Sequence, residues 1–208
     1  MIELLTADTP NGKKISIMLE EINYDYKITK INIYKDEQFK PEFKKISPFS
    51  KTPVIIDHKN NKSLFESGAI LIYLGEISGK FYDKNQRIII NQWLMGQMAY
   101  VGPMLGQHHQ FHHYNPGKSE FGENRYFKIA KRIYKELDER LSTSRFLAGN
   151  DYTIADIATF PWIARHKWHD IGLNKFNNLK RWYAEISKRE AVIKGYDLLK
   201  KGEVIPKV

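Results

Sequence analysis

The sequence has no cysteine among its 208 residues. This absence excludes disulfides, cysteine-ligated zinc or iron–sulfur sites and any mechanism with a cysteine nucleophile. Apolar runs of membrane-spanning length are also missing, and no basic stretch precedes an apolar core at the N-terminus. We therefore expect a cytoplasmic protein with no signal peptide and no membrane partner.

Arginine is absent from residues 1–80, where 12 lysines stand against 11 acidic residues. Residues 81–208 carry 21 basic and 13 acidic residues, so most of the net charge of +9 lies there. A basic half raises the possibility of nucleic-acid binding. Its basic residues, however, are scattered with acids one helical turn away, as in "KRIYKELDER", which is typical of a solvated helix face. No helix-turn-helix, zinc-finger or RNP pattern accompanies them, so we expect no nucleic-acid partner.

The apolar periodicity changes near residue 80. Before it, predicted strands at 1–7, 24–33, 53–57 and 62–66 alternate with predicted helices at 12–23, 40–46 and 67–77. This order predicts a small mixed sheet covered by helices. After residue 80 only helical periodicity remains, at 85–113, 120–142, 153–168, 178–188 and 191–200. We therefore expect an α/β domain over 1–80 and an all-helical domain over 86–208.

The stretch "TADTPNGKKI" (6–15) marks the turn from the first strand into the first helix. The Thr9 hydroxyl and the amides of Asn11 and Gly12 lie at the mouth of that helix, where the helix dipole favours a negative sulfur or oxygen. A simple capping loop without a ligand is the alternative.

Two later stretches have a similar ambiguity. In "KTPVI", a cis Thr52–Pro53 bond would turn the backbone N–H and C=O of Thr52 outward, where they can pair with a bound peptide. An ordinary trans proline that begins a strand is the alternative. In "FESGAILIYL", Ser67 is predicted as the N-cap of a helix and Glu66 precedes it. Together they suit the carboxylate and ammonium of an amino-acid end, and a plain N-cap is the alternative.

Four histidines occur in "GQHHQFHHYN". His108 and His112, like His109 and His113, have the i,i+4 spacing that can bind zinc. No acidic residue lies nearby in the sequence to complete a site, so we expect no metal. We expect these histidines to line a cleft or a subunit contact.

The order and spacing of these features resemble the glutathione transferases. Residues 1–80 look like their thioredoxin-like N-terminal domain, and the helical remainder looks like their C-terminal domain. In "YTIADIATFPW", Thr153 and Asp156 form a capping box such as this family has at the start of its sixth helix. "TPNGKKISIMLEE", "LFESGAILIYL" and "GPMLGQHHQF" resemble the bacterial nu class. The resemblance covers nearly the whole chain.

This resemblance implies a homodimeric enzyme with glutathione as co-substrate. The implied activity is that of a glutathione-dependent disulfide-bond oxidoreductase or glutathione transferase, in which the thiolate of bound glutathione is the nucleophile. Hydroperoxide reduction is a further implied activity. The second substrate would be a small disulfide, electrophile or hydroperoxide. The alternative is a non-catalytic regulatory or scaffold protein of the same fold.

The resemblance also assigns roles to residues of the first domain. Thr9 and Asn11 would approach the glutathione sulfur, and Gln38 would help to hold the peptide. Glu66 and Ser67 would bind the γ-glutamyl end.

Three further positions bear on these implied roles. Thr52 would pair with the cysteinyl backbone through a cis bond to Pro53, and relatives usually carry an aliphatic residue in place of this threonine. We expect little loss, since the contact uses backbone. Arg125, in "ENRY", would reach glutathione from the other subunit of a dimer. Leu5 stands where many transferases of other classes have a tyrosine, so we expect no tyrosine-assisted mechanism.

The thiol chemistry sets an energetic requirement. A free thiol has a pKa near ~8.5, and lowering it by about two units needs about 2.7 kcal/mol of extra stabilisation of the thiolate. A hydrogen bond to a charged group contributes about 1.5–3 kcal/mol, and a helix N-terminus adds about 0.3–1 kcal/mol. Thr9 together with the Asn11 end of the first helix meets this requirement.

Overall fold

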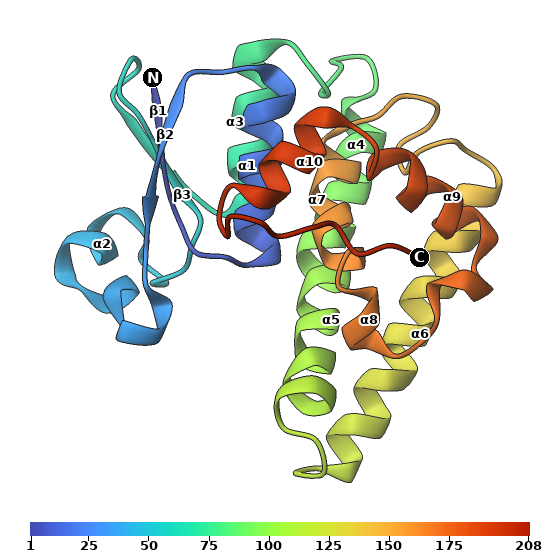
Figure 1. The fold of residues 1–208 in the computed structure, drawn as a ribbon. Helices are drawn as coiled ribbons and strands as arrows, with labels where there is room; N and C mark the ends of the chain where they lie inside the picture. The colour runs from blue at the N-terminus through green and yellow to red at the C-terminus, as the bar shows by residue number, and fades with distance from the viewer. The chain divides into compact units, whose positions relative to one another are not determined.

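The computed structural model describes all 208 residues, and the chain divides into two compact units (Figure 1). The first comprises Met1–Tyr82 and Arg189–Val204, and the second comprises Asp83–Lys188 and Ile205–Val208. Functional domains at 1–80 and 86–208 stay a prediction, to which the structure adds that Arg189–Val204 packs with the first unit. No helix has both the length and the apolar character that crossing a membrane requires.

The first unit contains a four-stranded sheet in the order β2-β1-β3-β4. Its strands are β1 (Ile2–Thr6), β2 (Tyr26–Lys30), β3 (Val54–Asp57) and β4 (Lys62–Phe65). β1 pairs in parallel with β2 and antiparallel with β3, and β4 is antiparallel to β3. The predicted mixed sheet is confirmed, although β2 is shorter than the stretch predicted for it.

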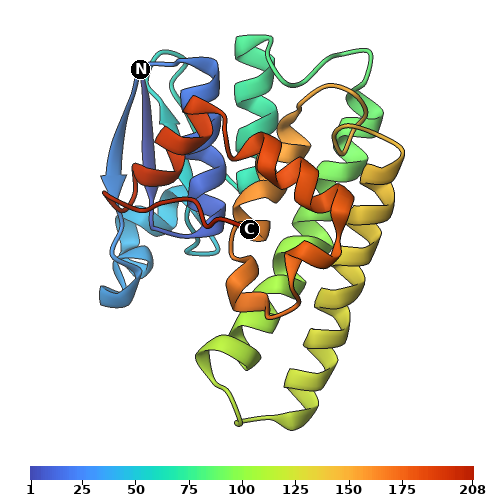
Figure 2. The ribbon, with the colours of Figure 1, turned by 45° about the vertical axis from the view of Figure 1, so that its right-hand side comes forward.

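Three helices pack together on one face of this sheet (Figures 1 and 2). They are α1 (Pro10–Ile22), α3 (Ser67–Ser78) and α10 (Glu190–Asp197), and α1 contacts both others. A Cβ atom on Gly195 would lie 2.5 Å from Ile17 Cα, so only glycine lets α10 approach α1 this closely. Ser16 Oγ donates a hydrogen bond to the Gly195 carbonyl at 2.7 Å. These contacts fix the C-terminal segment within the first unit.

The connection from β2 to β3 contains three short helices. They are the 3₁₀ turns η1 (Ile33–Lys35) and η2 (Glu37–Phe39), followed by α2 (Pro41–Ile46). Phe43 is the buried residue of α2, and α2 contacts β4. The predicted helix at 40–46 is confirmed.

The second unit is helical throughout. Its long first stretch consists of α4 (Arg87–Gly96), the π-helical η3 (Gln97–Val101), α5 (Gly102–His108) and the π-helical η4 (His109–Tyr114). It is followed by α6 (Glu120–Ser142), α7 (Ile154–Ile163), α8 (His166–His169), η5 (Leu173–Lys175) and α9 (Asn177–Ile186). The predicted span of α6 is confirmed. The helix predicted at 153–168 instead ends at Ile163 and resumes at His166.

α7 is the central helix of this unit, and all ten of its residues are buried. The predicted capping box at its start is confirmed, with the Asp156 carboxylate accepting from the Thr153 backbone N–H at 3.0 Å. The same carboxylate also accepts hydrogen bonds from Leu147 N at 2.9 Å and from Trp182 Nε1 at 2.8 Å. Burial raises the pKa of Asp156, and these bonds oppose the shift. The cap therefore also ties the preceding loop and α9 to α7.

Candidate functional site

The first candidate feature is the turn between β1 and α1. Thr9 is the N-cap of α1, and its hydroxyl oxygen accepts from Gly12 N at 3.0 Å. The hydroxyl hydrogen of Thr9 has no acceptor within the chain, so it can donate to a ligand. A Cβ atom at Gly12 would lie 2.4 Å from the Ala7 carbonyl oxygen, which explains the glycine in this turn.

The electrostatics of this helix end favour an anion. No acidic residue lies in the first turn of α1, and the half-buried Asn11 is its second residue. The carboxylate of Asp8, which precedes the N-cap residue, pairs with Lys13 Nζ at 3.0 Å. The backbone N–H groups at this end and the helix dipole can therefore stabilise a negative sulfur or oxygen.

The Thr52–Pro53 peptide bond is cis. The structure thus supports the cis bond, and not the ordinary trans proline, as the geometry of "KTPVI". Pro53 is buried and immediately precedes β3, whereas Thr52 is half-buried. Neither backbone polar group of Thr52 has a hydrogen-bond partner within the chain. Both groups are therefore available to pair with an extended ligand.

At the start of α3, the prediction that Ser67 is the N-cap is wrong. The N-cap is Glu66, and Ser67 is the first helical residue. Glu66 has φ 70°, a left-handed conformation that is rare for a residue other than glycine. This conformation ends β4 abruptly and leaves Ser67 already helical. Strained residues of this kind are often found at binding sites.

Lys14 is a residue of this region that the sequence reasoning missed. Its Nζ lies 3.4 Å from Ser67 Oγ, and its side chain is buried. Burial holds the pKa of Lys14 well below its usual value, and the Glu66 carboxylate opposes this shift. The signal that could have identified Lys14 is its position four residues before Met18, on the apolar stripe of α1.

Gln38 lies in η2, in the connection that follows β2. Its Nε2 donates to the Ile33 carbonyl at 3.3 Å, which fixes the orientation of the amide group. Its Oε1 is buried and has no hydrogen-bond partner. This oxygen can therefore accept a hydrogen bond from a ligand.

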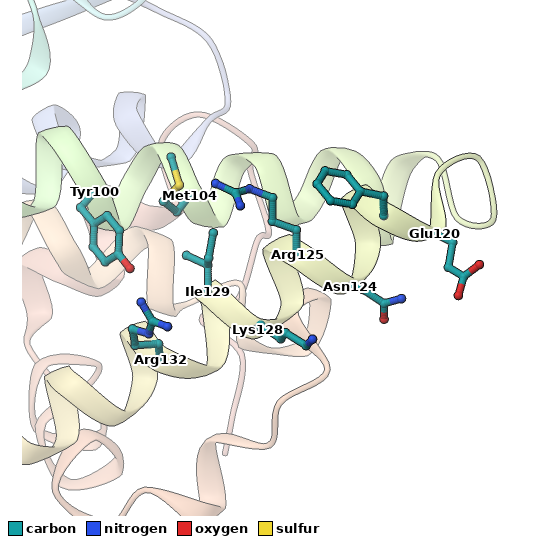
Figure 3. Close-up of a pocket in the computed structure, with 9 residues that line it drawn as sticks. Tyr100, Met104, Glu120, Asn124, Arg125, Lys128, Ile129 and Arg132 are labelled. Atoms are coloured by element: carbon teal, nitrogen blue, oxygen red, sulfur yellow. The ribbon is translucent and has the colours of Figure 1, made fainter.

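Arg125 lies in the second unit, on α6. Its side chain is exposed and lines a pocket of about 790 Å³ between α6 and the η3–α5 stretch (Figure 3). The other predicted site residues, Thr9, Asn11, Gln38, Thr52, Pro53, Glu66 and Ser67, belong to the first unit.

Comparisons with known proteins agree with this fold. Residues 3–76 match the family model of the glutathione S-transferase N-terminal domain, and residues 106–190 match that of the C-terminal domain. The chain is 42% identical to the disulfide-bond oxidoreductase YfcG of Escherichia coli, over 96% of this chain and 95% of that protein. The chain belongs to the glutathione S-transferase family.

Solved structures of the family also resemble this glutathione S-transferase. A glutathione transferase from Burkholderia graminis, with two glutathione molecules bound per subunit, is 37% identical with a TM-score of 0.90, covering 97% of this chain and 89% of that one. One from Pseudomonas putida, with one glutathione disulfide bound per subunit, is 38% identical with a TM-score of 0.88, covering 97% and 92%. The predicted fold class, a thioredoxin-like domain followed by helices, is confirmed.

Two of the four clustered histidines of this glutathione S-transferase do not lie where we expected. His108 and His109 do not line a cleft, because both are buried in the core of the second unit. His108 Nε2 lies 2.9 Å from the His169 carbonyl oxygen, and His109 Nε2 lies 2.8 Å from His169 Nε2. Outside this core, His113 stacks on Trp168 with ring centroids 4.0 Å apart. No group of three or more histidine or acidic side chains is arranged to hold a metal ion.

Proposed function

We propose that this chain is a glutathione-dependent disulfide-bond oxidoreductase that acts as a cytoplasmic homodimer. Glutathione is its co-substrate, and conjugation of electrophiles and reduction of hydroperoxides are further activities of the same thiolate. The observation that carries the proposal is the open N-terminus of α1, where Thr9 and Asn11 lie in a chain without cysteine. The identity to a disulfide-bond oxidoreductase over nearly the full chain supports it.

The proposed glutathione site uses the features of the first unit. The α-carboxylate binds the N-terminus of α3 and the Ser67 hydroxyl, and the ammonium group binds the exposed Glu66. The backbone groups of Thr52 pair with the cysteinyl residue. Gln38 holds the peptide, and the partner subunit's Arg125 reaches it from the other half of the dimer. This pose places the glutathione sulfur at the mouth of α1.

The proposed reaction is two successive thiol–disulfide exchanges. The Thr9 hydroxyl and the N-terminus of α1 stabilise the glutathione thiolate, which attacks one sulfur of the acceptor disulfide. A mixed disulfide forms and one acceptor thiolate leaves. A second glutathione thiolate attacks the glutathione sulfur of the mixed disulfide, giving oxidised glutathione and a second acceptor thiolate. The protein forms no covalent bond through sulfur at any step.

Two measurements on the purified protein test this function. Titration calorimetry with reduced and oxidised glutathione measures binding, and turnover of bis(2-hydroxyethyl) disulfide with glutathione measures reduction. We expect binding together with turnover above the uncatalysed rate. Binding without turnover of disulfide, electrophile or hydroperoxide would instead favour a regulatory or scaffold protein. Absence of binding would contradict both.

A further inference from the structure

The buried Lys13 joins the turn that begins α1 to the C-terminal segment of the first unit. Lys13 is the fourth residue of α1 and is only 1% exposed. Its Nζ lies 3.0 Å from Asp8 Oδ1. The same Nζ donates to the Tyr196 carbonyl at 2.7 Å and to Glu203 Oε2 at 2.5 Å. An ammonium group has three hydrogens, so these three acceptors satisfy it completely.

The segment that follows α10 is folded so that Glu203 reaches this lysine. Glu203 N donates to Asp197 Oδ1 at 2.8 Å. The buried Leu199 of the same segment lies against the β1–α1 turn, since a Cβ atom on Gly12 would be 3.2 Å from Leu199 Cδ1. The C-terminal segment therefore covers the turn from which α1 begins.

Lys13 is the one group in the chain that engages the Asp8 carboxylate. Asp8 immediately precedes Thr9, the N-cap of α1, and its side chain is 33% exposed. It lines a cavity of about 340 Å³ between this turn and residues 30–34, so an unpaired Asp8 side chain would have room to move. A carboxylate free to approach the mouth of α1 would disfavour a second negative charge there.

Other contacts hold α10 on α1 independently of Lys13. Arg189 Nε donates to Glu21 Oε1 at 2.6 Å, and Lys194 Nζ lies 2.7 Å from Glu20 Oε2. Both pairs involve the C-terminal half of α1, away from the turn. Loss of the Lys13 charge should therefore leave α10 in place and act on the turn.

We propose that Lys13 is a positioning residue for the glutathione thiolate: it holds the Asp8 carboxylate in an ion pair and so keeps that negative charge away from the sulfur at the mouth of α1. This inference rests on the proposed function, which places the sulfur there. Glu203 and the Tyr196 carbonyl fix Lys13 in turn. The C-terminal segment therefore supports a site that is built from the other end of the sequence.

The pKa of the bound glutathione thiol, read from thiolate absorbance across pH with the protein in excess, tests this inference. Lys13→Met fills the same space without the charge and leaves Asp8 unpaired. We expect it to raise the thiol pKa by about 0.5–1 unit relative to wild type, as one additional nearby charge does in a partly solvated site. At pH 5.5, where little of the bound thiol is ionised, kcat/KM for bis(2-hydroxyethyl) disulfide should fall about three- to ten-fold. Lys13→Met/Asp8→Asn also removes the opposing charge and should restore the wild-type pKa.

Two matched controls separate Asp8 from a general charge effect. Lys13→Met/Glu203→Gln removes the same charge from the same cluster but leaves Asp8 unpaired, so its thiol pKa should stay raised. Lys194→Met breaks the ion pair with Glu20 and should keep the wild-type pKa. An unchanged pKa in Lys13→Met, or equal restoration by Glu203→Gln, would overturn the inference. Slower turnover of Lys13→Met at an unchanged thiol pKa would also overturn it, by showing a structural role alone.

Asp8→Asn tests the same relationship in a chain that keeps Lys13 and its bond to Glu203. This change should not raise the thiol pKa, and a rise would overturn the inference even if Lys13→Met does not fold. A wild-type protein that binds no glutathione, or that leaves the thiol pKa at its free value, would contradict the proposed function itself. A lowered thiol pKa that is the same in wild type and every variant contradicts the Lys13 inference alone.

Discussion

Lys14 Nζ lies 3.4 Å from Ser67 Oγ, and both side chains are buried in the first unit. This contact joins α1 to α3 where α3 begins, beneath the exposed Glu66. A buried lysine is a poor choice for stability, because burial disfavours its charged form. Because it lies next to the proposed γ-glutamyl site, we expect it to contribute to glutathione binding instead.

Replacing Lys14 with Met should separate these two effects. We expect the free energy of unfolding at neutral pH to rise by about 1–2 kcal/mol, because an apolar side chain of similar length fills the same space. Glutathione should bind more weakly, because the contact of Lys14 Nζ with the Ser67 hydroxyl oxygen, which positions that hydroxyl, is lost. Urea denaturation and calorimetry measure the two effects. Lys44→Met, at an exposed position of α2, should change neither.

The pH dependence of unfolding should identify the same lysine. Burial lowers the pKa of Lys14 from its ordinary value of 10.5, so below pH 10.5 the unfolded chain takes up a proton that the folded chain does not. The contribution of Lys14 to stability is therefore full above pH 10.5 and is lost as the pH falls towards the folded-state pKa. Its slope reaches about 1.4 kcal/mol per pH unit. Wild type should lose stability relative to Lys14→Met as the pH falls below 10.5, and parallel curves would contradict the assignment.

Gly12 should not tolerate a side chain. A Cβ atom there would lie 2.4 Å from the Ala7 carbonyl oxygen and 2.5 Å from Thr6 Oγ1. We expect Gly12→Ala to destabilise the protein by about 1–3 kcal/mol and to weaken glutathione binding, because the turn that carries Thr9 must move. Gly96→Ala is the matched control, since no atom lies within 4 Å of a Cβ there. That change should stabilise by about 0.5–1 kcal/mol, and thermal unfolding of both variants makes the comparison.

The buried histidines should make the second unit sensitive to acid. Burial, assisted by the positive charge of Arg165, lowers the pKa of His109 to about 3, and burial also lowers that of His169. The unfolded chain binds protons near pH ~6.5, so this contribution is full above that pH and is lost as the pH falls towards 3. At pH 5, one such histidine lowers the free energy of unfolding by about 2 kcal/mol.

A variant at this position tests the acid sensitivity. His109→Phe should be less stable at pH 7.5, because His169 Nε2 loses its partner, but should show a shallower loss of stability towards pH 5. Denaturation at the two pH values measures this. The exposed His113→Phe should retain the full slope, and a slope unchanged in His109→Phe would refute the assignment.

Local motifs were readable from the sequence. The capping box at Thr153 and Asp156 and the span of α6 both depend on residues within a few positions of one another. The turn at Thr9 and Asn11 was readable for the same reason. Each depends on short-range hydrogen bonding and on helical periodicity, which the sequence records directly.

Features set by tertiary contacts were not readable. Ser67 is not the N-cap that the sequence predicts, because Glu66 adopts a positive φ. The local preferences of glutamate do not indicate this conformation. His109 contacts His169, which lies 60 residues further along the chain, so the stretch "GQHHQFHHYN" alone could not predict this pair. The packing of α10 on α1 depends on the close approach of Gly195 to Ile17. In each case, a partner distant in the sequence decides the structure.

The most direct test of the account is the ionisation of bound glutathione. Ultraviolet absorbance of the thiolate, followed across pH with the protein in excess, gives the pKa of the bound thiol. In the wild-type protein we expect it to lie about two units below that of free glutathione, and Asn11→Ala should raise it and slow turnover while the fold remains intact. Identical titration curves for the two proteins would contradict the role of Asn11, and a wild-type pKa equal to that of free glutathione would contradict the central claim.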